Sequence, residues 1–100
     1  SESREEYSRR CSFLCGSLNK LVLKCFMPKC AFYLFASVEN TGLDGEQFAE
    51  KLLAAEKVAV VPGSAFGGAG KYFVRASYAA SMKQLSEAVR RIAAFLGKTL

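Results

Sequence analysis

The chain has 100 residues, of which 51% are hydrophobic and 23% charged, and its formal net charge is +5 with no histidine. These values are typical of a single globular domain with one core, and they exclude an intrinsically disordered segment. They also exclude a membrane-spanning helix, because the longest clear apolar run covers only residues 31–38, whereas a span needs about 18 to 20 residues.

The first third of the chain predicts a helix followed by two strands. Ser3 with Glu6 three residues later forms a capping-box pattern at the helix start. Spacings of three and four then place one apolar stripe on a helix: Tyr7, Cys11, Leu14, Leu18 and Leu21. Two β-rich runs follow, at residues 23–27 and 31–38, and the short break around Pro28 favours antiparallel pairing.

The middle of the chain predicts a second helix and two further strands. Asp44 and Gln47 form another capping pattern. The helix that follows is predicted to bury one face, made of Phe48, Leu52 and Ala55. Residues 58–61 and 72–79 are typical of short apolar strands, and a glycine-rich loop separates them.

A last helix completes the pattern. Ser81 and Gln84 mark its start, and its apolar positions recur every three or four residues: Met82, Leu85, Val89, Ile92 and Phe95. The predicted order is therefore α-β-β-α-β-β-α. We expect one α/β (α+β) domain over residues 1–100, with a small mixed or antiparallel sheet of about four strands covered by helices on one side.

Cysteine and histidine usage limits the possible chemistry. The four cysteines, Cys11, Cys15, Cys25 and Cys30, match no usual zinc-ligand spacing, and the N-terminal segment lacks the apolar stretch of a secretory signal. We therefore expect reduced thiols in a cytoplasmic protein without a metal. The absence of histidine excludes Ser/His and Cys/His nucleophiles. The basic residues are scattered, which is typical of solvated helix faces and indicates neither nucleic-acid nor membrane binding.

The loop at residues 62–70 contains four glycines but does not match a phosphate-binding motif. Ala65 stands where a Walker loop has its first glycine, and Tyr72 stands where that loop has Ser or Thr. A dinucleotide fingerprint also fails, because a strand rather than a helix is predicted to follow. The pattern favours a flexible connection between two strands.

Arg75 is a single cation in the apolar strand predicted at residues 72–79. Strand alternation puts it on one face with Phe73, Ser77 and Ala79. Its charge has three explanations: the side chain reaches solvent from an edge strand, it pairs with an internal carboxylate, or it binds an anionic ligand. The pattern alone favours the first two explanations over the third.

Four motifs together resemble the C-terminal end of class I aminotransferases, which are pyridoxal-phosphate enzymes of the aspartate aminotransferase fold type. They are KCAFYLFASVENTG (29–42), FAEKLL (48–53), KVAVVPGSAFG (57–67) and FVRASYAAS (73–81). The likeness extends over essentially the whole chain, and the motifs keep the family's order and spacing.

The resemblance implies a role for Arg75, and it implies that the chain is part of a larger parent protein. In the family, the arginine at this position grips the α-carboxylate of an amino acid or 2-oxo acid substrate, and a guanidinium fork suits that task. The lysine that binds pyridoxal 5'-phosphate lies upstream, in a large domain through which family members commonly form homodimers. Four lysines of this chain are candidates for that cofactor-binding position, and none of them matches it: Lys20, Lys24, Lys29 and Lys71.

Two functional hypotheses follow. The first is the small C-terminal domain of an aminotransferase, with no cofactor bound to this chain alone and no turnover without the large domain. The second is a free-standing, non-catalytic interaction module of the same fold, in which Arg75 pairs with an internal acid such as Glu39 or Glu50.

Overall fold

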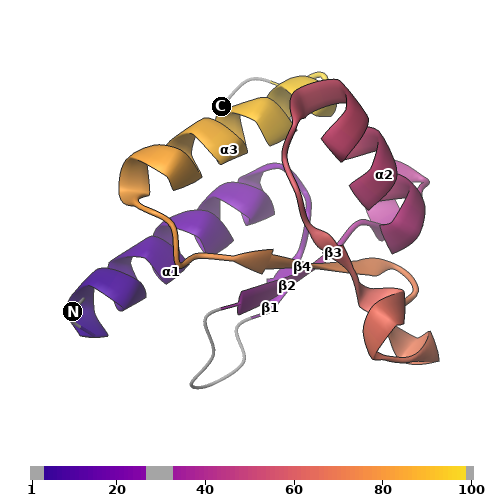
Figure 1. The fold of residues 1–100 in the computed structure, drawn as a ribbon, viewed down its shortest axis with the longest axis horizontal. Helices are drawn as coiled ribbons and strands as arrows, with labels where there is room; N and C mark the ends of the chain where they lie inside the picture. The colour runs from indigo at the N-terminus through magenta and orange to yellow at the C-terminus, as the bar shows by residue number, and fades with distance from the viewer. Residues whose placement is uncertain (1–3, 27–32, 99–100) are drawn as a thin grey trace.

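The computed structural model describes residues 4–26 and 33–98, which form a sheet with helices on one face (Figure 1). The three helices are α1 (Arg4–Lys20), α2 (Gly45–Glu56) and α3 (Met82–Phe95). The strands are β1 (Cys25–Phe26), β2 (Tyr33–Ser37), β3 (Val61–Pro62) and β4 (Phe73–Ser77). Three short 3-10 helices connect them: η1 (Glu39–Thr41), η2 (Gly63–Phe66) and η3 (Gly68–Gly70). The predicted element order and fold class are confirmed.

The sheet is antiparallel throughout, with the strand order β1-β2-β4-β3. β1 and β2 pair as neighbours in sequence, as predicted, with Cys25 opposite Ala36. The central ladder joins distant parts of the chain, since Phe35 of β2 lies opposite Arg75 of β4. β3 pairs with the other edge of β4, with Val61 opposite Arg75. β4 is therefore an interior strand.

Two of the predicted helix starts carry complete capping boxes. At α2, the Asp44 carboxylate accepts a hydrogen bond from the Gln47 backbone N–H at 2.8 Å, and the Gln47 side chain accepts one from the Asp44 N–H at 3.0 Å. Ser81 and Gln84 repeat this arrangement at α3, at 3.2 and 3.0 Å. Each box satisfies two backbone donors that the helix itself cannot satisfy. The predicted box at Ser3 lies outside the described residues.

The core lies between the sheet and the helix layer. Its largest fully buried side chains, among the described residues, are Leu23, Leu34, Val38, Phe48, Leu52 and Val89. The ring of Phe48 on α2 packs edge-on against Phe95 of α3, with centroids 5.4 Å apart. This contact joins two of the helices above the sheet.

Two details of the predicted elements are wrong. Ala55 is exposed, and the buried face of α2 uses Gly45, Phe48, Ala49 and Leu52 instead. The strand predicted at residues 58–61 is shorter, because only Val61 and Pro62 join the sheet. Val58 and Val60 still pack against the core from outside the ladder, so their apolar character reflects burial rather than strand pairing.

Candidate functional site

Arg75 lies on the face of the sheet opposite the helix layer. Its neighbours along β4 point the other way, since Val74 is buried and Ala76 packs against the core. Because successive strand residues alternate between faces, Arg75 projects from the helix-free side. The explanation that places Arg75 on an edge strand is wrong, because β4 pairs with β2 on one side and β3 on the other.

The guanidinium of Arg75 contacts two aromatic rings. Its central carbon lies 4.1 Å from the ring centroid of Tyr33 and 4.8 Å from that of Phe66. Both distances are within the range of about 6 Å in which a cation is attracted to the face of an aromatic ring. The half-buried charge is therefore stabilised by rings from two different elements, β2 and η2.

No carboxylate neutralises this cation within the described parts of the chain. There the Arg75 side chain has neither an ion pair nor a hydrogen bond, and in particular neither Glu39 nor Glu50 pairs with it. An arginine whose faces contact rings keeps its N–H donors, which lie in the guanidinium plane, available for an anion. This part of the structure can therefore bind a planar anionic group such as a carboxylate.

The glycine-rich loop folds into η2 and η3 beside β4. Gly63 and Gly70 approach each other so closely that a Cβ atom on either would collide with the backbone of the other. Ser64 adds a hydrogen bond of 3.0 Å from its hydroxyl to the Glu46 carboxylate on α2. Two of its glycines, Gly63 and Gly70, therefore serve close backbone packing. Because the loop leads into β4, no helix N-terminus is available there to hold a phosphate.

The three described cysteines form no metal site. Cys11, Cys15 and Cys25 are not disulfide-bonded, and no group of histidine, cysteine and acidic side chains in the described residues is arranged to hold a metal ion. Burial raises the pKa of the Cys25 thiol well above its ordinary value, and the neighbouring Cys15 and Cys11 add to the effect. Cys30 lies outside the described residues.

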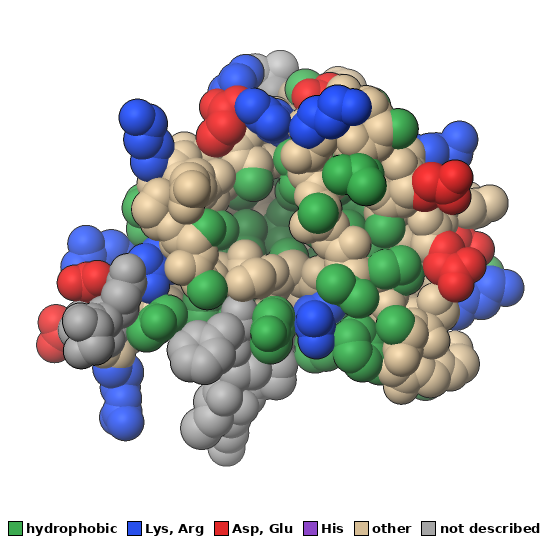
Figure 2. All heavy atoms as spheres, viewed as in Figure 1, with side chains coloured by type: hydrophobic (Ala, Val, Ile, Leu, Met, Phe, Trp, Pro, Cys, Tyr) green, Lys and Arg blue, Asp and Glu red, His purple; other side chains and the backbone are tan. Residues whose placement is uncertain are grey.

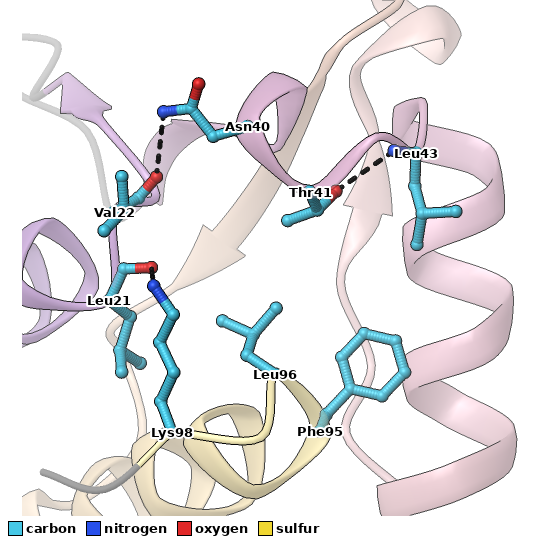
Figure 3. A pocket seen from close by; sticks show the side chains of 8 residues that line it. All are labelled: Leu21, Val22, Asn40, Thr41, Leu43, Phe95, Leu96 and Lys98. Carbon is cyan, nitrogen blue, oxygen red and sulfur yellow. Dashed lines mark hydrogen bonds between the residues drawn. The ribbon is translucent and has the colours of Figure 1, made fainter.

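Two of the hollows that described residues line lie on the helix side of the molecule, away from Arg75. One, of about 360 Å³, lies between the end of α1, η1 and the end of α3 (Figure 3). Its polar groups are already engaged, because Lys98 donates to the Leu21 carbonyl at 3.4 Å and Asn40 to the Val22 carbonyl at 3.5 Å. The other, an open groove of about 1010 Å³, runs between α3 and residues 57–59, and Figure 2 shows hydrophobic side chains at its floor. Neither is lined by a residue that contacts Arg75.

The residues that sequence reasoning missed here are Tyr33 and Phe66. Alternation along residues 31–38 puts Tyr33 and Phe35 on one face, but only the pairing of β2 with β4 places that face beside Arg75. Phe66 follows no periodic pattern, because it lies in the loop. The one signal in the sequence was a large apolar residue among glycines, and that signal does not indicate which residue Phe66 contacts.

Comparison with known proteins finds relatives over nearly the whole chain. The family model described as aminotransferase class I and II matches residues 1–92. An aspartate aminotransferase of Pyrococcus abyssi is 47% identical over 91 residues, which are 91% of this chain and 23% of that protein. An aromatic-amino-acid aminotransferase of Thermococcus litoralis is 45% identical over 91 residues, with the same two shares.

A solved structure shows the same fold. The aromatic aminotransferase from Pyrococcus horikoshii superposes with a TM-score of 0.90 and 45% identity, over 94% of this chain and 25% of that one. The chain therefore spans about a quarter of the length of the relatives it matches.

Proposed function

Because this chain belongs to the class I and II aminotransferases, we propose that residues 1–100 are the small C-terminal domain of a pyridoxal-phosphate-dependent aminotransferase. In this proposal the parent moves an amino group between an amino acid and a 2-oxo acid, and Arg75 binds the α-carboxylate of both. The observation that carries the proposal is a half-buried guanidinium on an interior strand that no carboxylate of the described residues neutralises.

The position of Arg75 suits carboxylate binding. Its backbone is fixed on both sides, by the ladder to Phe35 and by the ladder to Val61. A guanidinium can donate two parallel hydrogen bonds to one carboxylate, which fixes both the distance and the orientation of the substrate. Orientation of this kind lowers the barrier of a subsequent reaction by holding the reacting atoms in place.

The described residues do not fit covalent attachment of pyridoxal 5'-phosphate. A lysine that forms a Schiff base with it is usually desolvated, which lowers its pKa. Every described lysine is exposed: Lys20, Lys24, Lys51, Lys57, Lys71, Lys83 and Lys98. Lys29 lies outside the described residues. We therefore assign the cofactor to the remainder of the parent protein and expect the 100-residue chain alone to be inactive.

The alternative of a free-standing interaction module predicted an internal partner for Arg75. Neither of the two acids considered, Glu39 and Glu50, forms that ion pair.

No helix in the described residues is long and apolar enough to cross a membrane. The cytoplasmic location and the homodimeric parent stay predictions.

The test is substitution of Arg75 in the full-length parent enzyme. For Arg75→Ala we expect kcat/KM for the amino acid to fall on the order of 10²- to 10³-fold, because the carboxylate loses a bidentate charged partner. Arg75→Lys keeps the charge without the fork and should fall in between. The control is Arg90→Ala, since the Arg90 side chain is 70% exposed and pairs with Glu87.

Steady-state kinetics and the absorption spectrum of the bound cofactor provide the readout. We expect the cofactor spectrum to stay unchanged in all three variants, because Arg75 is assigned to the substrate. Kinetics for Arg75→Ala equal to those of the unmodified enzyme would reject the role assigned to Arg75.

A further inference from the structure

The two features that stood out in the sequence, Arg75 and the glycine-rich loop, meet at one contact. We propose that Tyr33 and Phe66, here called the aromatic pair, are positioning residues that hold the Arg75 guanidinium ready for a carboxylate, and that the folded loop serves to place Phe66. This inference rests on the function proposed for Arg75. The distances of 4.1 and 4.8 Å from the guanidinium carbon to the two ring centroids carry it.

Tyr33 is placed by the register of the sheet. Phe35 lies directly opposite Arg75, and Tyr33 lies two residues away on β2, opposite Ser77. Tyr33 and Arg75 are therefore diagonal neighbours on the same face, a separation that a long side chain and an aromatic ring can bridge. A shift of one residue in the register would move Tyr33 to the core face and remove the contact.

Phe66 is placed by the loop. Its ring packs edge-on against Phe35, with centroids 6.2 Å apart, and Phe35 in turn lies opposite Arg75. The loop is folded back by the close contact of Gly63 with Gly70, a contact that no side chain could occupy. The Phe66 ring therefore reaches the guanidinium from outside the sheet.

An arginine needs such support when it has no fixed partner. Its long side chain has many accessible rotamers, and part of this conformational entropy is lost when it binds a ligand. Rings that restrict the side chain beforehand reduce that loss and so increase the affinity for the ligand. Rings carry no formal charge, so they restrict the guanidinium without neutralising it, whereas a carboxylate would compete with the substrate.

The first experiment uses leucine substitutions in the full-length parent enzyme. For Tyr33→Leu and Phe66→Leu we expect KM for the amino acid to rise roughly 3- to 30-fold with kcat little changed, as for loss of binding shared by ground and transition states. Tyr33→Phe keeps the ring and should restore the original KM. Tyr72→Leu is the matched control, because Tyr72 is also exposed but its ring contacts Lys71.

Two further readouts separate positioning from a general structural effect. Reaction with an amine that has the same side chain but no α-carboxylate should be unchanged in the leucine variants. Replacing Phe66 with phenylalanines of increasing ring fluorination weakens the attraction to a cation at nearly constant shape, so KM should rise stepwise. This series also serves if a leucine variant fails to fold.

The outcomes distinguish the two proposals. If Arg75→Ala raises KM while the leucine variants and the fluorinated series leave it unchanged, the aromatic pair has no positioning role and the inference is wrong. If Arg75→Ala itself leaves KM unchanged, the proposal that Arg75 binds the substrate carboxylate is wrong. A loss of the amine reaction equal to that of the amino acid would also contradict positioning.

Discussion

At the scale of single residues, burial changes the chemistry of Cys25. The Cys25 backbone N–H donates to the Asn19 side chain at 3.0 Å, which holds the start of β1 against the end of α1. Its thiol is half-buried, and desolvation, with a smaller effect from the neighbouring Cys15 and Cys11, raises its pKa and keeps it protonated. Cys25 thus behaves as a small apolar side chain rather than as a nucleophile.

This raised pKa predicts how stability depends on pH. The unfolded thiol ionises near its ordinary value of 9.0, whereas the folded thiol stays protonated. Its contribution is therefore complete below pH 9.0 and decreases as the pH rises above that value. We expect Cys25→Ala to reduce the alkaline loss of stability in urea unfolding followed by circular dichroism. Raised pKa values at Cys11 and Tyr78 leave part of the loss in place, and an identical alkaline slope in the variant would contradict the assignment.

At the scale of elements, the helices were predictable because local rules determine them. The two capping boxes and the buried positions Leu85, Val89 and Ile92 follow from spacing alone, and the structure confirms them. Ala55 was predicted wrongly because helix periodicity gives the buried face only approximately, and α2 turns Ala49 inward instead. Strands depend on pairing with distant residues, so they are harder to predict locally. The strand predicted at β3 was too long because Val58 and Val60 pack against the core without pairing in the sheet.

Two helical glycines provide a matched test of close packing. A Cβ at Gly16 on α1 would meet nothing within 4 Å, whereas a Cβ at Gly45 on α2 would collide with the Phe73 carbonyl oxygen. Alanine favours a helix by about 0.5 to 1 kcal/mol over glycine. We expect Gly16→Ala to stabilise the chain by about that amount and Gly45→Ala to destabilise it. Chemical unfolding of both variants measures the difference, and a stabilising Gly45→Ala would show that α2 and β4 are not in such close contact.

At the scale of the whole molecule, the single helix layer makes burial strongly asymmetric. Leu52 and its neighbour Leu53 on α2 show this, since Leu52 is completely buried and Leu53 is 50% exposed. We expect Leu52→Ala to lower the free energy of unfolding by about 2 to 5 kcal/mol, and Leu53→Ala by less than about 1 kcal/mol. Thermal and urea unfolding provide the measurement, and equal losses would indicate that something also covers the outer face of α2.

The candidate site was only partly predictable from the sequence, because its geometry depends on contacts between elements that are far apart in the chain. Arg75 stood out because a charge interrupts an apolar strand, and the resemblance supplied an expected role. Its surroundings depend on the strand order, which puts β4 between β2 and β3 and brings Tyr33 beside it. No local pattern in one sequence specifies such long-range pairing, so the edge-strand explanation could be excluded only with the fold in view.

The central ladder also affects how the chain assembles. It joins residues 33–37 to residues 73–77, with α2, β3 and the glycine-rich loop in between. During synthesis on the ribosome, α1 and β2 therefore emerge well before the strand that completes their sheet. Until β4 follows, one edge of β2 has no native partner, and α1 still lacks its packing against α3. This interval is when chaperones would be most needed.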